Sequence, residues 1–226
     1  NKYTSDGSYL PYAAWVSFNI DDPAGSFTEL SRGGVEFYEA AYDGELIYGL
    51  DTDNNFYSVN PETFESTLIG SISDTANSMT YDWEHDTFYI VNGNLQIREL
   101  RKDGSLGSAI TPANVVCIAP VTYVGNGEFL SLDFNTRNYV RIAADGSTTQ
   151  LAHSHGLQGW SSSMVYNRED GKCYICYTNM QNGDDTSSVG FWGKLFAIDP
   201  VTGEGEYRGF IGEDYGTYVN GMCIAD

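Results

Sequence analysis

Four large aromatic residues and several polar residues lie in the longest polar segments of the second half of the chain. Aromatic rings beside carboxylate, amide and imidazole groups suit neutral sugars, which offer C–H faces for stacking and hydroxyls for hydrogen bonds. The same groups suit a protein ligand. Alternatively, the rings fill gaps in a core, since aromatic side chains dominate core packing. The candidate binding residues are Trp160, Trp192, Tyr215, Tyr218, His155, Asp184, Asp185 and Asn220.

Two segments resemble metal sites in residue type but lack the full spacing. His153 and His155 flank one serine, which places two imidazoles on the same side of an extended segment, but the spacing fixes no third ligand. The run 51–55 resembles the start of a calcium loop with Glu62 at its twelfth position, yet Phe56 stands where such a loop needs glycine. Solvated histidines and a hairpin turn are the preferred interpretations. No metal or cofactor is therefore predicted, and a partial calcium site with oxygen ligands remains the alternative.

Signatures of catalysis are weak. The chain has no Gly-x-Ser-x-Gly, no His-Glu-x-x-His and no phosphate-binding loop. A glycosidase would need two carboxyl groups about 5–10 Å apart that face one cleft. Acidic residues are abundant enough to supply such a list by chance, so no catalytic residue is predicted and enzyme activity stays open. The candidates for a carboxyl pair are Asp74, Asp133, Asp184, Asp185, Glu213 and Asp214.

The elements that must position these residues form a repeat. Five hairpins can be laid over one another, and each is a short alternating apolar run that ends in a turn of Asp or Asn, Pro and Gly. A second strand rich in Thr, Leu and Ile follows each turn. A repeat of roughly 40 residues made only of strands is typical of the blades of a β-propeller. The hairpins begin at Phe18, Tyr57, Ile97, Tyr139 and Phe196.

A second repeated segment sets the order of strands within a blade. Ser78-Met-Thr-Tyr-Asp82 is matched at 39–43, 120–124 and 163–167, and more loosely by Gly221-Met-Cys-Ile-Ala225. Each blade is therefore predicted to contain strand a (this segment), strand b, and a hairpin of strands c and d. The strands b expected after the complete copies are 46–51, 87–92, 128–133 and 172–177.

The chain is therefore predicted to be all-β, with residues 1–226 forming a single five-bladed β-propeller domain of four-stranded blades. Residues 219–226 are expected to be the innermost strand of the blade whose outer strands lie within 14–20 and 26–30. The C-terminal strand would then join the N-terminal blade and close the ring, which removes two open sheet edges. A coincidental apolar tail is the alternative.

The cysteines are Cys117, Cys173, Cys176 and Cys223. Cys173 and Cys176 are three residues apart on an expected strand, so their sulfurs point to opposite faces and cannot share one metal or bond to each other without distortion. One face looks toward the blade of Cys117 and the other toward the blade of Cys223. Two disulfides between blades are conceivable, but four buried free thiols are preferred.

Propeller geometry assigns the candidate residues to one face. The b–c loops and the connections from strand d to the next strand a gather around one mouth of the central channel, and the a–b and c–d turns lie on the other face. The candidates fall in the connections 152–160 and 212–220 and in the insertion 179–192. Long loops without structure of their own are often functional. A tolerated surface insertion is the alternative for 179–192.

Charge excludes some partners. The net charge is −20, the pI is near 4.2, and 11 Lys and Arg are available to neutralise phosphates. Nucleic acid and anionic membrane surfaces would be repelled, and no apolar run is long enough to insert into a membrane. Neutral glycans, proteins, basic peptides and cations are the remaining partner classes. Acidity that only keeps the protein soluble is the alternative.

The segment Leu195-Phe-Ala-Ile-Asp-Pro-Val-Thr-Gly-Glu204 is similar to the repeat of quinoprotein-like and YVTN-type propellers of secreted or surface-attached bacterial proteins. The segment 78–90 resembles the preceding a–b hairpin of that repeat. The resemblance implies blade geometry and a secreted or cell-surface location, without the quinone-binding residues. We expect a binding module for a glycan or protein, compatible with one domain of a longer surface protein. The alternatives are a glycosidase-like enzyme with a carboxylate pair at the channel mouth, and a structural spacer.

Overall fold

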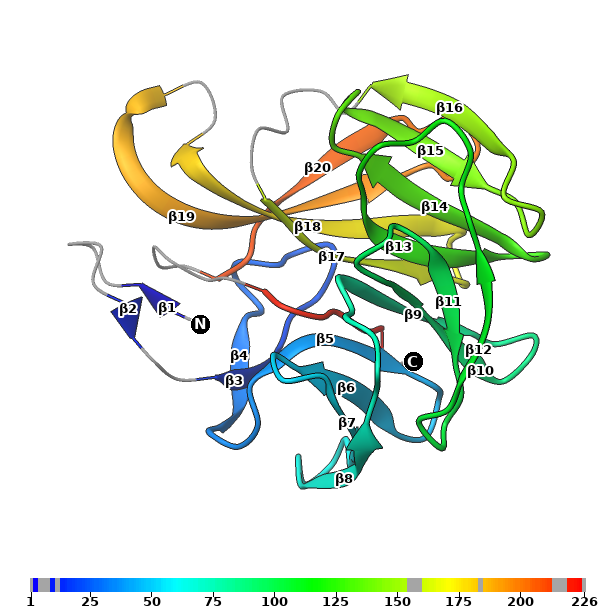
Figure 1. Cartoon of the computed structure of the whole chain (residues 1–226). Coiled ribbons are helices and arrows are strands. Elements are labelled where there is room, and N and C mark those ends of the chain that lie inside the picture. The colour runs from blue at the N-terminus through cyan, green and yellow to red at the C-terminus, as the bar shows by residue number, and fades with distance from the viewer. Residues whose placement is uncertain are drawn as a thin grey trace.

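The structure is a computed structural model that describes residues 2–3, 9–10, 13–153, 160–182, 185–212 and 219–224, with side chains described within 13–153, 163–177, 193–212 and 219–224. These residues form strands and turns and no helix. Four sheets of four antiparallel strands stand in a ring around a central channel, and the two-stranded sheet β3–β4 stands between the first and last of them (Figure 1). The predicted all-β propeller arrangement is confirmed.

In each complete sheet the strands follow sequence order from the channel outward, which is the predicted order a, b, c, d. Each innermost strand contacts the next in the order β5, β9, β13 and β17. The first two sheets are β5 (Phe37–Tyr42), β6 (Ile47–Asp51), β7 (Asn55–Val59) and β8 (Ser66–Ser71), then β9 (Ser78–Asp82), β10 (Thr87–Val91), β11 (Ile97–Leu100) and β12 (Leu106–Ile110). The next two are β13 (Ile118–Gly125), β14 (Glu128–Asp133), β15 (Asn138–Ile142) and β16 (Thr148–His153), then β17 (Trp160–Asn167), β18 (Lys172–Asn182), β19 (Asp185–Ile198) and β20 (Gly205–Phe210).

Side chains of Asp and Asn close the turns between these strands. At the end of strand b, Asp51 Oδ1 accepts the backbone N–H groups of Asp53 and Asn55. Asn92 and Asp133 hold the following b–c turns in the same way. Such side chains offer the backbone a local acceptor and so favour turns. The resemblance of 51–55 to a calcium loop thus reflects a b–c turn held by its own carboxylate.

The apolar core divides into five clusters, one at each junction around the ring. Alternation with period two along each strand sends one set of side chains toward each neighbouring sheet. At the junction between the first two complete sheets, for example, the ring centroids of Tyr48 and Phe88 are 4.7 Å apart. Burial of each such side chain contributes about 1.5–3 kcal/mol. The core therefore lies between the sheets and ties each one to the next.

The fifth position differs from the prediction. It holds β3 (Ala14–Ser17) and β4 (Thr28–Arg32), and the short strands β1 (Lys2–Tyr3) and β2 (Tyr9–Leu10) pair with each other instead. The described C-terminal residues 219–224 form no strand, so the predicted four-stranded fifth blade and its C-terminal strand are not formed within the described residues. A ladder needs an adjacent strand, and no described strand lies between 219–224 and β3.

Packing nevertheless places the C-terminal segment where closure of the ring was predicted. Met222 and Ile224 pack with the sheet of β17–β20, and Cys223 packs with the sheet of β5–β8. This alternation is that of an extended segment between two sheets. Figure 1 shows the segment (red) running between β17 and β5 toward the middle of the ring. Residues 219–224 are therefore held beside the N-terminal hairpin by side-chain packing. Among the described residues, no backbone ladder joins them to it.

The sequence suggested that the insertion 179–192 is a loop without regular structure, but its described residues form strands. β18 and β19 continue their ladder beyond the sheet, with Asn179 paired to Trp192 and Asn182 to Asp185. The reason lies at Tyr177, which stands where Asp51, Asn92 and Asp133 close the b–c turn in the other sheets. Without that acceptor the strands run on, and they project from the ring (Figure 1).

The four cysteines are free, as preferred from the sequence. Cys173 packs toward the sheet of β13–β16 and Cys176 toward the C-terminal segment, so the two sulfurs do lie on opposite faces of β18. Cys117 differs from the prediction because it is exposed, whereas burial raises the pKa of the Cys173 thiol well above its usual range. The buried thiols therefore act as small apolar groups.

Gly221 offers a test of the closure. Its φ of +68° disfavours any other residue, and a Cβ there would lie 2.7 Å from the Ala40 backbone nitrogen of β5. Gly33 is the matched control, because its φ is +87° and a Cβ added there would meet nothing within 4 Å. We expect Gly33→Ala to lower the free energy of unfolding by about 1–2 kcal/mol. Gly221→Ala should lower it by a further 1–3 kcal/mol or so in urea titrations. Equal losses would contradict the packing of this segment on β5.

Candidate functional site

A cavity of about 100 Å³ opens at one mouth of the central channel. Small side chains at matching positions of the innermost strands and the C-terminal segment line it, which keeps the channel open. This mouth lies among the a–b turns, which the sequence analysis placed on the face opposite the candidate residues. The matching residues are Ala41, Thr80, Thr122, Val165 and Cys223.

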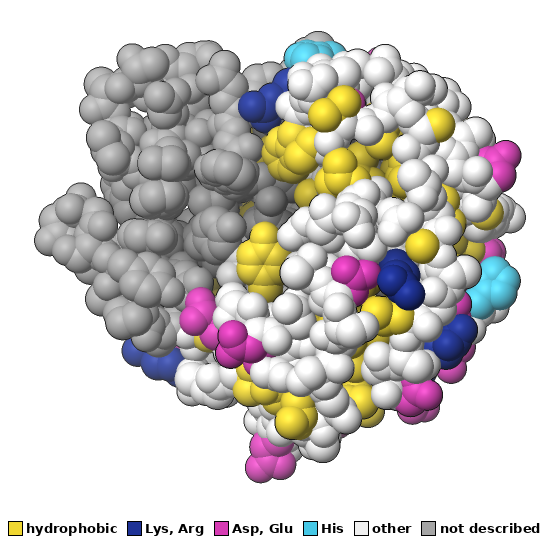
Figure 2. Space-filling model, in the orientation of Figure 1, with side chains coloured by type: hydrophobic (Ala, Val, Ile, Leu, Met, Phe, Trp, Pro, Cys, Tyr) yellow, Lys and Arg dark blue, Asp and Glu magenta, His cyan; other side chains and the backbone are white. Residues whose placement is uncertain are grey.

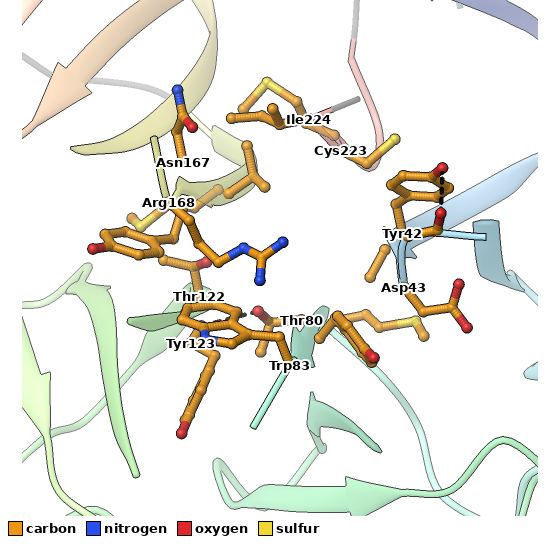
Figure 3. Close-up of a pocket in the computed structure, with 18 residues that line it drawn as sticks. Tyr42, Asp43, Thr80, Trp83, Thr122, Tyr123, Asn167, Arg168, Cys223 and Ile224 are labelled. Atoms are coloured by element: carbon orange, nitrogen blue, oxygen red, sulfur yellow. Dashed lines mark hydrogen bonds between the residues drawn. The ribbon is translucent and has the colours of Figure 1, made fainter. Parts of the chain in front are cut away.

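Aromatic rings and one guanidinium form the rim of this channel mouth (Figure 3). Trp83 stacks on Tyr166 with ring centroids 5.5 Å apart and 14° between the planes, and Tyr123 meets it edge-on at 4.8 Å. The Arg168 guanidinium lies 5.5 Å from the Trp83 ring and points toward the middle of the cavity. Ligand pockets usually measure about 300–1,000 Å³, so this mouth can hold an end group and not a whole ligand.

The carboxylate at this mouth is already engaged. Lys102 Nζ lies 2.7 Å from Asp43 Oδ2 and 2.6 Å from Asp86 Oδ1, which bridges two neighbouring sheets. Burial alone would raise the pKa of Asp43, but hydrogen bonds from the Leu46 backbone and from Lys102 outweigh it, so that pKa is lowered. Asp43 therefore stays ionised at neutral pH and is unsuited to donate a proton as a general acid.

A second carboxyl, that of Glu39, is buried on β5 two residues before Ala41. Glu39 is 2% exposed and accepts the backbone N–H of Met79 from the next innermost strand. Its Oε2 has no hydrogen-bond partner within the described residues. Burial raises the pKa of Glu39 well above its usual range, more than the Met79 hydrogen bond lowers it. The fold thus favours a neutral Glu39.

A larger groove of about 610 Å³ lies at the incomplete fifth position. The β3–β4 hairpin and residues 219–224 line it, together with aromatic side chains of the adjacent sheets. Trp15 stacks on Phe64 with centroids 5.6 Å apart and lies 5.7 Å from Phe37 on one side, and Tyr174 lines the other. The volume falls within the usual range for ligand pockets. This groove is the better candidate for a binding site.

Of the predicted binding residues, Asn220 lies in this groove. His155, Asp184, Tyr215 and Tyr218 fall outside the described residues, as do the side chains of Trp160, Trp192 and Asp185. The backbone of Trp160 begins β17, and Asp185 and Trp192 belong to β19. The predicted aromatic cluster therefore stays a prediction.

Other predicted polar candidates have roles in turns and between strands. Asp74 accepts the Asn92 side-chain amide at 2.9 Å, and His153 Nδ1 lies 3.0 Å from Asn138 Oδ1. The predicted carboxylates Glu213 and Asp214 lie outside the described residues. None of these described contacts brings two of the predicted carboxyl groups into one cavity.

One acidic cluster was missed from the sequence. Ligand atoms of Asp82, Glu84 and His85 all lie within 4.8 Å of one another, in the a–b turn after β9. Asp82 accepts the Glu84 and His85 backbone N–H groups, while Glu84 accepts the Tyr123 hydroxyl and the Asn126 backbone N–H of the next sheet. These bonds give the cluster a structural use, since they hold the turn and join two sheets.

The groove and the channel mouth were not predicted as sites. Trp15 falls within the outer strand expected at 14–20, and Trp83 and Arg168 follow copies of strand a, in a–b turns on the face opposite the candidate residues. A signal was present in the repeat, because the C-terminal copy of strand a and the N-terminal hairpin supply strands a, c and d but no strand b.

On the face shown in Figure 2, acidic, basic and apolar side chains are interspersed over the described residues. No basic patch gathers on this part of the surface. The described part of the chain also contains no helix long and apolar enough to cross a membrane.

Solved structures share this architecture. A chain of the nidogen/laminin complex matches with a TM-score of 0.58 at 13% identity, over 88% of this chain and 73% of that one. A Bacteroides thetaiotaomicron protein of unknown function matches with a TM-score of 0.58 at 15% identity, over 92% of this chain and 61% of that one. TolB from Acinetobacter baumannii matches with a TM-score of 0.52 at 14% identity, over 88% and 53%.

The fold is that of a β-propeller. At these identities the likeness shows the fold alone. No family model matches the chain, and no curated protein matches it. The chain spans about three fifths or less of the Bacteroides and Acinetobacter propellers.

Glu39 predicts how stability varies with pH. Its pKa in the folded state is raised above the value of about 4.3 expected in the unfolded chain. The folded state therefore holds its proton more tightly, and stability should fall as pH rises from about 4.3 toward the folded pKa. Glu39→Gln removes this titration. The free energy of unfolding of the variant, relative to that of the wild type, should therefore increase as pH rises from about 4 to 8. Exposed Glu62→Gln is the control and should follow the wild type. Parallel profiles for all three proteins would refute a neutral Glu39.

Proposed function

We propose that this propeller is a binding module that acts outside the cell or on its surface and holds a protein or glycan in the groove at its fifth position. The observation that carries the proposal is the groove of about 610 Å³ between the β3–β4 hairpin and residues 219–224, which is lined by Trp15, other aromatic side chains and Asn220. Apolar walls with a few polar groups are the usual form of a binding pocket.

The ring has five positions in this proposal. Five core clusters support it, because two of them lie on either side of the β3–β4 hairpin and the C-terminal segment. The fifth blade is then the one that remains incomplete. Binding sites often lie where a rigid scaffold leaves an opening, since the scaffold fixes the geometry of the walls.

Similar solved structures lend further support. One neighbour is a chain of a nidogen/laminin complex, which favours a protein ligand. Neighbours from Bacteroides thetaiotaomicron and Acinetobacter baumannii accord with the resemblance to quinoprotein-like and YVTN-type bacterial repeats. The predicted aromatic residues Trp160, Trp192, Tyr215 and Tyr218 remain proposed contacts for a ligand that extends beyond the groove.

Binding is preferred to hydrolysis because the described carboxyl groups are committed elsewhere. A glycosidase needs an acid and a base that face one cleft. Asp43 is held ionised by Lys102, and Glu39 is a single buried carboxyl that accepts a backbone N–H from Met79. We therefore expect the ligand to be bound and released without chemical change.

Two exposed leucines on outermost strands test the proposal. Leu30 on β4 is 49% exposed and lines the groove, whereas Leu68 on β8 is 57% exposed and lies away from it. Glycan arrays and displayed peptide libraries should identify ligands of the wild type. Leu30→Lys should weaken their binding about tenfold or more, because a charge must be desolvated at the wall. Leu68→Lys should bind normally, and both should keep the melting temperature. Equal effects of the two changes, or cleavage of a bound oligosaccharide, would contradict the proposal.

A further inference from the structure

The complete sheets show what normally fills the place of the groove. Strand b lies between the innermost strand and the third strand in each of them. It is largely buried, as β6 and β14 illustrate with four and five buried residues in succession. At the fifth position Met222, Cys223 and Ile224 stand beside the channel with the innermost strands, and β3 takes the place of strand c. No described strand lies between them.

The groove has the shape and lining that a strand b would require. Residues 13–20 form one side and residues 219–224 the other. Neighbouring strands lie about 4.7–4.9 Å apart, so omission of one strand leaves a slot one strand wide. Trp15 and Phe37 face the slot from the side of β5–β8, and Val165 and Tyr174 from the side of β17–β20. A strand between two apolar walls is apolar on both faces.

The backbone of β3 offers hydrogen bonds toward this slot. β7, the third strand of the first complete sheet, pairs with both β6 and β8. Within the described residues β3 pairs with β4 alone. Because N–H groups alternate in direction along a strand, half of those in Ala14–Ser17 point away from β4. An open strand edge beside an apolar slot is the arrangement that accepts an added strand.

We propose that an extended apolar segment of a partner polypeptide adds to β3 as the absent strand b, antiparallel to it. The segment spans five or six residues, the lengths of β6, β10 and β14. A partner supplies it because the described N-terminal strands of this chain, β1 and β2, are already paired with each other. The net charge of −20 and Glu169 at the groove favour basic residues beside the segment. This inference rests on the proposed function and names its ligand as a polypeptide.

The test uses the full chain and a synthetic peptide. The probe carries the sequence of β10, Thr87-Phe-Tyr-Ile-Val91, between pairs of lysines. The control peptide carries Tyr89→Pro, which keeps the charge but removes a backbone donor and disfavours a strand. Hydrogen exchange of Ala14–Ser17 is followed with each peptide at about 1 mM, and Ile47–Asp51, already paired on both edges, serve as the internal reference. Amides of Ala14–Ser17 should exchange about tenfold more slowly with the probe and unchanged with the control.

Each other outcome overturns strand addition. If neither peptide binds, or the probe binds without protecting Ala14–Ser17, the ligand is not held as a strand. If Ala14–Ser17 of the free protein exchange as slowly as Ile47–Asp51, the slot is already filled by this chain. Ligand binding that depends on Leu30 without protection of β3 would leave the proposed function standing. Insensitivity to Leu30→Lys would instead remove the proposed function.

Discussion

Hydrogen bonds from the innermost strand of one sheet to the next hold this ring together. The Val121 backbone N–H donates to Ser78 Oγ at 2.9 Å, and the Tyr123 N–H donates to Thr80 Oγ1 at 2.9 Å. The Met79 N–H donates to Glu39 in the same manner. The inner edge of each sheet faces a narrow channel and has no strand to pair with among the described residues, and a buried N–H without a partner costs about 1–3 kcal/mol. Ser78, Thr80 and Glu39 supply the acceptors, which fixes the register between the innermost strands β5, β9 and β13.

Local patterns made much of the fold predictable. The expected strand b at 128–133 is β14, and the others agree to within a residue or two except β18. Alternation and turn chemistry act over a few residues, so one sequence carries them. The extension of β18 was readable in principle at Tyr177, where a turn-closing Asp or Asn is absent. The C-terminal segment lies beside the channel, as its pattern indicated, but the strand predicted for it is not formed within the described residues.

The candidate site was less predictable because cavities arise from the assembled ring. Trp83 and Arg168 belong to short a–b turns, and only the assembled ring brings them to the mouth of the channel. Trp15 alternates in its strand like any core residue. The acidity of the chain also has a structural source, since Asp43, Asp51 and their counterparts accept backbone N–H groups in nearly every turn. Carboxylates that close turns carry no information about a ligand.

The N-terminal residues 13–32 contact the last complete sheet and residues 219–224 along a seam. This seam bears on the order in which the molecule folds. Each complete sheet is built from consecutive strands, so its contacts close short loops and form early. Contacts across the seam join residues far apart in sequence; Arg208 and Asp21, which lie 3.5 Å apart, are separated by 187 residues. Closing so long a loop costs conformational entropy, and the chain loses this entropy before the contacts across the seam can form. We therefore expect the seam to assemble last and to open before the four complete sheets come apart.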